Sequence, residues 1–288
     1  MTRLWCELAW LGGDGATPGV RIDIANDRIE GVTVGGEPPG DAVRMEGLTL
    51  PGLANAHSHA FQRALRGRTH GGTGSFWTWR EQMYSLAGKL DPDSYLALAR
   101  ATFGEMALAG ITLVGEFHYV HHGPDGRPYD DLNAMGNAVL RAAAEAGVRI
   151  TLIDACYLRG GFSEALDPVQ RRFSDVSADA WASRVDGLHE GSLSRVGAAI
   201  HSVRAVDPGS ARVVGEWARA HGAPLHAHLS EQPAENEGCL AAHGLTPTAL
   251  LGDLGALDDR FTAVHATHVT DIDVALLGDA GATCCLCP

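Results

Sequence analysis

From about Leu48 to its end, the sequence alternates short apolar runs with amphipathic stretches, and this rhythm limits the fold more than any other feature. Apolar residues at helical spacing predict helices over 93–110, 132–147, 209–222, 232–243 and 271–280. Strands that alternate with helices form βαβ units and a parallel sheet. The runs that we expect to be strands are LTLPGLANAH, ITLVGEFHYV, ITLIDACYL, VGAAIHSV, PLHAHLS, TAVHATHV and ATCCLCP.

Polar residues at the ends of these seven runs favour a TIM-like (β/α)8 barrel over a doubly wound sheet, because such a barrel gathers its chemistry at the strand ends. The last run stops at Pro288 with no helix after it. We therefore expect a barrel that is truncated before strand eight and whose parent chain continues. A naturally open barrel of seven units is the alternative.

The first fifty residues follow a different pattern. The segment VRIDI at 20–24 alternates apolar and charged residues, and a second short run follows an Asn26-Asp27 turn. These are signals of short strands joined by a hairpin. The sequence therefore predicts two domains, with strands over 1–50 and the barrel over 51–288.

Composition narrows the function. The chain has 288 residues and a formal net charge of −13, which argues against nucleic acid as a partner because phosphate binding needs a basic surface. No apolar stretch approaches the roughly 18 residues of a membrane span, and no secretory signal is visible. Six cysteines are too irregularly placed for a disulfide framework. We expect a cytoplasmic protein with a small-molecule substrate, no nucleic acid and no membrane.

Histidines stand at the ends of several predicted strands. His57 and His59 follow the first one, and in an extended segment both side chains share a face. Two neutral imidazoles on one face, about 7 Å apart along the strand, can converge on one zinc ion. His226 and His228 share a face at the end of the fifth strand, so either is a candidate for the third ligand. Glu231 follows, and a carboxyl beside a metal-bound water can shuttle a proton.

Two further histidines, His265 and His268, lie three residues apart on the sixth strand, so they point to opposite faces and one is a packing or surface residue. His201 ends the fourth strand. Each histidine alone is more often structural than functional. Because strand ends meet in one place in a barrel, their combination predicts a metal site. We expect His121 and His122 at the surface, Cys284, Cys285 and Cys287 in a buried strand, and a lid in the glycine-rich loop at His70.

These motifs make the chain recognisable. His-x-His after strand one, His-x-x-Glu after strand five and His after strand six resemble the deaminase branch of the amidohydrolase superfamily. More narrowly, HSHAFQRALRG, SFWTWREQMY, EFHYVHH, AIHSVRAV and LHAHLSEQ resemble the formimidoylglutamate deiminase family. The resemblance runs from about residue 1 to 288. It implies that the N-terminal strands are half of a small β-sandwich completed after the barrel.

The resemblance also implies roles for individual residues. It makes His57, His59 and His228 the metal ligands, Glu231 the proton shuttle, and His265 the residue that helps to activate water. One zinc ion per chain is implied, and iron or another divalent metal also accepts imidazole ligands. A further aspartate at the end of strand eight would lie beyond this sequence. A homodimer is implied, and the residues implied to line the substrate pocket are Gln62, Arg80, Tyr119, His201 and Arg204.

The implied reaction is the zinc-dependent hydrolysis of N-formimino-L-glutamate to N-formyl-L-glutamate and ammonia. The residues agree with a substrate that has two carboxylates. The planar fork of arginine matches a carboxylate, and Arg80 and Arg204 both lie within the motifs above. One alternative is a deaminase of a heterocycle such as guanine or adenosine, which would need stacking aromatics instead of paired arginines. Another is an inactive fragment that binds a metal or ligand without turnover.

Overall fold

The computed structural model describes residues 1–68 and 76–287, and for Phe76 and Trp77 only the main chain. The chain divides into two compact units, Met1–Leu53 and Ala54–Pro288. Each unit has its own sheet, and the two are described separately below. Among the described residues, no helix is both long enough and apolar enough to cross a membrane.

The N-terminal unit is a four-stranded sheet. Its order is β3-β2-β1-β4, with antiparallel pairs except for the parallel pair β1/β4. Asn26 and Asp27 join β2 to β3 with φ of 49° and 59°, the left-handed pair of a type I′ hairpin turn, as the sequence predicted. A small core of Cys6, Ala9 and Val20 lies against the sheet. The strands are β1 Thr2–Ala9, β2 Thr17–Ala25, β3 Arg28–Val34 and β4 Val43–Thr49.

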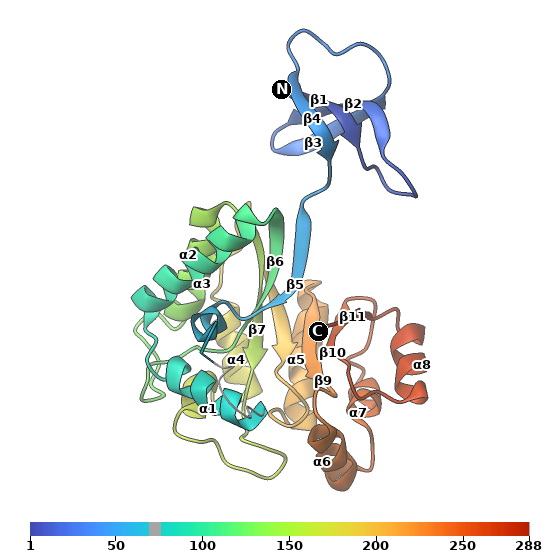
Figure 1. Ribbon diagram of the computed structural model, residues 1–288. Helices are drawn as coiled ribbons and strands as arrows, with labels where there is room; N and C mark the ends of the chain where they lie inside the picture. Colours follow the sequence, from blue (N-terminus) through green and yellow to red (C-terminus); the bar gives the residue numbers. More distant parts are fainter. Residues whose placement is uncertain (69–75, 288) are drawn as a thin grey trace. The chain divides into compact units, whose positions relative to one another are not determined.

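The second unit is built on a seven-stranded sheet with the order β11-β10-β9-β8-β7-β6-β5 (Figure 1). The pairs from β6 to β11 are all parallel. Consecutive strands in sequence are neighbours in the sheet, which confirms the predicted TIM-like barrel up to its seventh strand. The strands are β5 Leu53–Ser58, β6 Ile111–His118, β7 Arg149–Cys156, β8 Ser194–Ile200, β9 Leu225–Leu229, β10 Phe261–His265 and β11 Thr283–Cys285.

Helices connect these strands and begin at clear local signals. Asp91, Asp207 and Thr246 each cap a helix by accepting a hydrogen bond from a backbone N–H, and a proline that lacks an N–H follows each of them. The helices are α1 Phe76–Ala87, α2 Pro92–Leu108, α3 Ala134–Ala146, α4 Ala178–Val185, α5 Pro208–His221, α6 Pro233–His243, α7 Pro247–Asp253 and α8 Asp271–Asp279, with the 3-10 turns η1 Ala60–Leu65 and η2 Gln170–Phe173.

His121 and His122 correct the sequence prediction, because they are buried rather than at the surface. His122 Nε2 lies 3.1 Å from Asp175 Oδ1, and the same carboxylate pairs with the buried guanidinium of Arg184 at 2.8 Å. Arg184 also pairs with Asp154 at 2.7 Å. A buried charge is tolerated only when it is paired and hydrogen-bonded, so this network draws the polar segment inward.

The C-terminal cysteines give a second correction. Cys284 and Cys287 are exposed, and Cys285 is half-buried. In the described sheet β11 is an edge strand, paired on one side with β10. An apolar composition does not distinguish an edge strand from a central one, which is why the sequence suggested burial.

Candidate metal and substrate site

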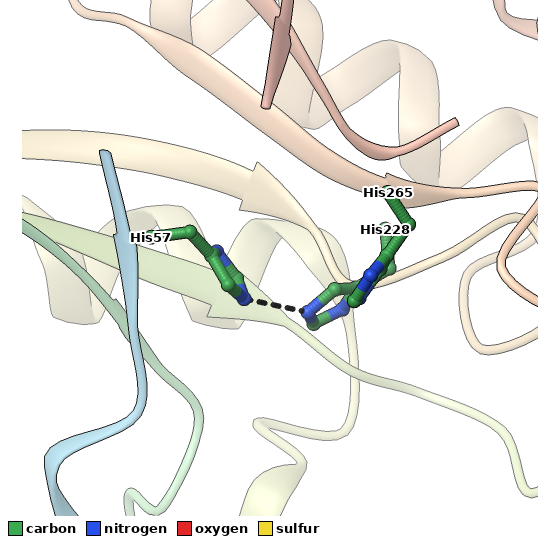
Figure 2. A group of neighbouring side chains, drawn as sticks. All are labelled: His57, His228 and His265. Atoms are coloured by element: carbon green, nitrogen blue, oxygen red, sulfur yellow. Dashed lines mark hydrogen bonds between the residues drawn. The ribbon is translucent and has the colours of Figure 1, made fainter. Parts of the chain in front are cut away.

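Three histidines from the carboxyl ends of separate strands point toward one another (Figure 2). His57 lies on β5, His228 on β9 and His265 on β10, and one ring nitrogen of each lies within 4.8 Å of the other two. They line a cavity of about 730 Å³. Parallel strands place their carboxyl ends at one rim of the sheet, so residues 57, 228 and 265 meet although the chain separates them widely.

The tightest cluster includes His59. Its Nε2 atom lies 3.1 Å from His57 Nε2 and 3.3 Å from His228 Nε2, and the His228–His57 distance is also 3.3 Å. Ligand nitrogens at 2.0–2.1 Å from a tetrahedral zinc ion are about 3.3–3.4 Å apart. The three nitrogens therefore form a triangle of the size that such an ion requires. His265 is less close, since it shares only the wider 4.8 Å group.

Main-chain carbonyls fix the orientation of two of these rings. His59 Nδ1 lies 2.8 Å from the Phe117 carbonyl oxygen, and His228 Nδ1 lies 3.0 Å from that of His201. A carbonyl only accepts hydrogen bonds, so both Nδ1 atoms carry the proton and both Nε2 atoms present lone pairs. Two lone pairs 3.3 Å apart repel unless a cation lies between them. The residues present therefore fit a metal ion.

Burial keeps these imidazoles neutral. It lowers the pKa of His59 to about 4, and it lowers the pKa of His57 and of His228 well below the ordinary value of 6.5. Neutral imidazole is the form that binds a metal. His226, the other candidate on β9, is buried with a pKa lowered to about 4, but it lies outside the triangle and its Nδ1 has no partner among the described residues.

Glu231 and His265 face each other at the cavity wall, with Glu231 Oε1 3.8 Å from His265 Nε2. Ser230, directly before Glu231, and His265 itself both have left-handed backbone conformations, with φ of 49° and 73°. Such conformations cost about 1–3 kcal/mol each in residues other than glycine. These turns direct the chain back over the strand ends. The Glu235 carboxylate accepts a hydrogen bond from the Glu231 N–H at 3.2 Å, which holds the turn.

The other residues of the predicted pocket all line the same cavity. Gln62 Nε2 donates to the hydroxyl of Tyr119 at 3.2 Å, and Arg80 Nε donates to the hydroxyl of Tyr84 at 2.8 Å. Arg204 forms no hydrogen bond or ion pair within residues 1–68 and 76–287, although it acts electrostatically on the buried Glu235. A half-buried guanidinium without a protein acceptor is suited to an anionic ligand. The five predicted pocket residues are all among those that line the cavity: Gln62, Arg80, Tyr119, His201 and Arg204.

Sequence reasoning missed Glu116, a fully buried side chain of β6 that contacts the backbone directly after His59. Its Oε1 accepts the Ala60 N–H at 2.6 Å, and burial raises its pKa to about 8. The preceding Gly115 lets the backbone lie close to Ala56, because a Cβ there would lie 2.7 Å from the Ala56 carbonyl oxygen. The available signal was a glutamate that interrupts the apolar run ITLVGEFHYV.

Two other predictions have different outcomes. His268 is exposed, and only its main chain is used, since its carbonyl accepts from Asn236 and its N–H donates to Ser230. It is therefore the surface histidine of the sixth-strand pair. The lid predicted at His70 lies outside the described residues.

A histidine cluster suited to a metal, at the carboxyl rim of a (β/α) barrel, is the arrangement of the metal-dependent barrel hydrolases. The sequence gives the family itself: residues 48–288 match the Amidohydrolase family, and the chain belongs to it. The predicted resemblance to this superfamily is confirmed.

Individual relatives agree with this membership. Formimidoylglutamate deiminase of Pseudomonas aeruginosa is 37% identical over 295 residues, which cover 100% of this chain and 64% of that protein. 5'-Deoxyadenosine deaminase of Methanoregula boonei is 30% identical over 234 residues, or 81% of this chain and 48% of that protein. The crystal structure of an amidohydrolase from Brucella melitensis superposes with a TM-score of 0.92 at 36% identity, covering 100% of this chain and 65% of that one. The chain thus spans about half to two thirds of the length of these relatives.

Proposed function

We propose that this protein hydrolyses N-formimino-L-glutamate to N-formyl-L-glutamate and ammonia with the help of one divalent metal ion, zinc. The observation that carries the proposal is a single cavity that contains both the histidine triangle and two arginines. The triangle supplies a metal site, and the arginines match the two carboxylates of the substrate. The name of the relative from Pseudomonas aeruginosa supports the same substrate.

The metal would be held by His57, His59 and His228. When bound there, zinc supplies Lewis-acid activation of water at neutral pH. Zinc suits three neutral imidazoles, and iron accepts the same donors, so metal availability decides between them. A full equivalent of metal per chain is the expected loading.

The protein groups divide the remaining work. Glu231 takes a proton from the attacking water and gives it to the departing nitrogen, because its carboxylate faces the cavity beside the triangle. His265 Nε2 lies 3.8 Å from Glu231 Oε1. His265 donates a hydrogen bond to the group on the attacked carbon where charge develops. The arginines hold the glutamate carboxylates away from the reacting carbon, so remote binding energy positions the formimino group.

The direct test is ammonia release by the zinc-loaded protein from N-formimino-L-glutamate, measured beside guanine and adenosine. We expect turnover of the formimino substrate and none of the heterocycles. A heterocycle deaminase would need stacking aromatics and neutral amide groups in place of the arginines. Turnover of guanine or adenosine with none of N-formimino-L-glutamate would overturn the proposed substrate and leave the metal site in place.

Arg204 provides a test of the substrate's charge. The Arg204→Ala variant is expected to raise KM by about 10- to 100-fold, the loss for a hydrogen bond to a charged group, while bound zinc stays at the wild-type level. Steady-state kinetics and metal analysis measure the two quantities. Arg212→Ala, on the exposed side of α5, is the matched control. An unchanged KM in Arg204→Ala would remove this residue from carboxylate binding.

A further inference from the structure

Two tyrosines stand side by side in the cavity wall, between the two arginines. Tyr84 comes from α1, and Tyr157 directly follows β7. Both hydroxyls accept a hydrogen bond from the same side chain, that of Gln170, and Arg80 and Arg204 both act on Tyr157 electrostatically. Two cations and two hydroxyls therefore share one end of the cavity. Which way the hydroxyl protons point decides whether that end donates to a ligand or accepts from it.

A buried glutamine sets that direction. Gln170, the first residue of η2, is fully buried. Its Oε1 accepts the backbone N–H of Asp167 at 2.7 Å, and a backbone N–H can only donate. This fixes the amide so that Nε2 faces the tyrosines, where it donates to Tyr84 at 2.9 Å and to Tyr157 at 2.8 Å.

Both hydroxyls therefore act as acceptors toward Gln170. The Tyr84 oxygen accepts from both Gln170 Nε2 and Arg80 Nε, so its two lone pairs are occupied. Its own proton must therefore point away from both of these donors. The Tyr157 oxygen likewise accepts from Gln170, which leaves its proton for a group in the cavity. Burial raises the pKa of Tyr157, so the hydroxyl keeps that proton at neutral pH.

We infer that Gln170 is a specificity-determining positioning residue, which makes the Tyr157 hydroxyl a donor between Arg80 and Arg204 and so turns this end of the cavity into a carboxylate subsite. The inference rests on the proposed function for the identity of the substrate, but the subsite takes any small dicarboxylate. Gln170 itself lies behind the wall and is absent from the cavity lining. Its effect is transmitted through the tyrosine pair.

The test reverses the hydrogen bonds without changing the size of the side chain. In Gln170→Glu, one carboxylate oxygen still accepts from Asp167, but the other accepts from a tyrosine and withdraws the proton from the cavity. We expect KM for N-formimino-L-glutamate and the Kd of the dicarboxylate glutarate, measured by calorimetry, each to rise about 10- to 100-fold. Turnover number, zinc content and Tm should stay near wild-type values. Gln170→Met, which removes the amide without reversing it, should have a smaller effect.

Gln82→Glu is the matched control, because it makes the same charge change on the exposed face of α1, and it should bind glutarate like the wild type. Glutarate separates this inference from the proposed function. If the wild type binds glutarate and Gln170→Glu does not, the subsite stands even when another substrate is turned over. Equal KM and Kd in Gln170→Glu and the wild type would overturn the inference and leave the proposed reaction intact, as would failure of the wild type to bind glutarate while it turns over N-formimino-L-glutamate.

Discussion

Replacing His228 with alanine is expected to remove the metal ion and to reduce ammonia release by on the order of 10³-fold or more, since Lewis-acid activation is worth several kcal/mol of barrier. His228 Nε2 lies 3.3 Å from both other nitrogens of the triangle, so its loss leaves only two ligands. Metal content by mass spectrometry and ammonia release measure the two effects. Circular dichroism checks that the barrel is still folded.

The control for this variant is His268→Ala, which removes an exposed imidazole from the loop after β10. It should retain one equivalent of zinc and wild-type turnover. Wild-type metal content in His228→Ala would mean that the ion binds elsewhere. The next site to test would be the other group of possible ligands among the described residues, His118, His121 and Asp154.

The second large effect is expected for Glu231→Gln, which should retain zinc but lose turnover by about 10²- to 10⁴-fold, the usual contribution of a positioned acid–base group. The amide has the size of the carboxylate but cannot take up the proton from water. KM should change little, because the residue moves a proton rather than holding the carboxylates. Single-turnover kinetics and metal analysis on the same preparation measure both quantities.

Glu237→Gln makes the same substitution on the exposed face of α6, two residues from the buried Glu235. It should behave like the wild type. Turnover of Glu231→Gln within tenfold of Glu237→Gln would show that another group carries the proton. His265, 3.8 Å from Glu231, would be the first residue to test next.

The barrel and the grouping of the strand-end histidines could be predicted from the sequence, because both depend on patterns within single segments. Strand and helix periods are visible in single segments, and His57 and His59 stand at a strand end where a barrel collects its ligands. The choice between His226 and His228 was not local. Both share a face of β9, and what distinguishes them is the carbonyl of His201 on the neighbouring strand connection, 3.0 Å from His228 Nδ1.

Long-range polar contacts account for the other differences. Gln170 lies in a connection with no periodic pattern, and only the fold places it behind Tyr84, 86 residues away in the sequence. His121 and His122 precede a segment rich in glycine, proline and aspartate, which suggested a surface loop. Their backbone N–H groups instead donate to the carbonyl of Arg172, a fully buried arginine, and this holds both imidazoles inside.

The backbone anchoring of the metal ligands bears on how such a site can diverge. His59 and His228 are oriented by the carbonyl oxygens of Phe117 and His201, and every amino acid carries a carbonyl. The side chain of His201 meanwhile lines the substrate cavity. Under the proposed function, one position would serve the metal through its main chain and the substrate through its side chain. A substitution at position 201 would therefore change the side chain that faces the cavity, while the carbonyl that orients His228 would remain. Substrate specificity could then change without loss of the metal-site geometry.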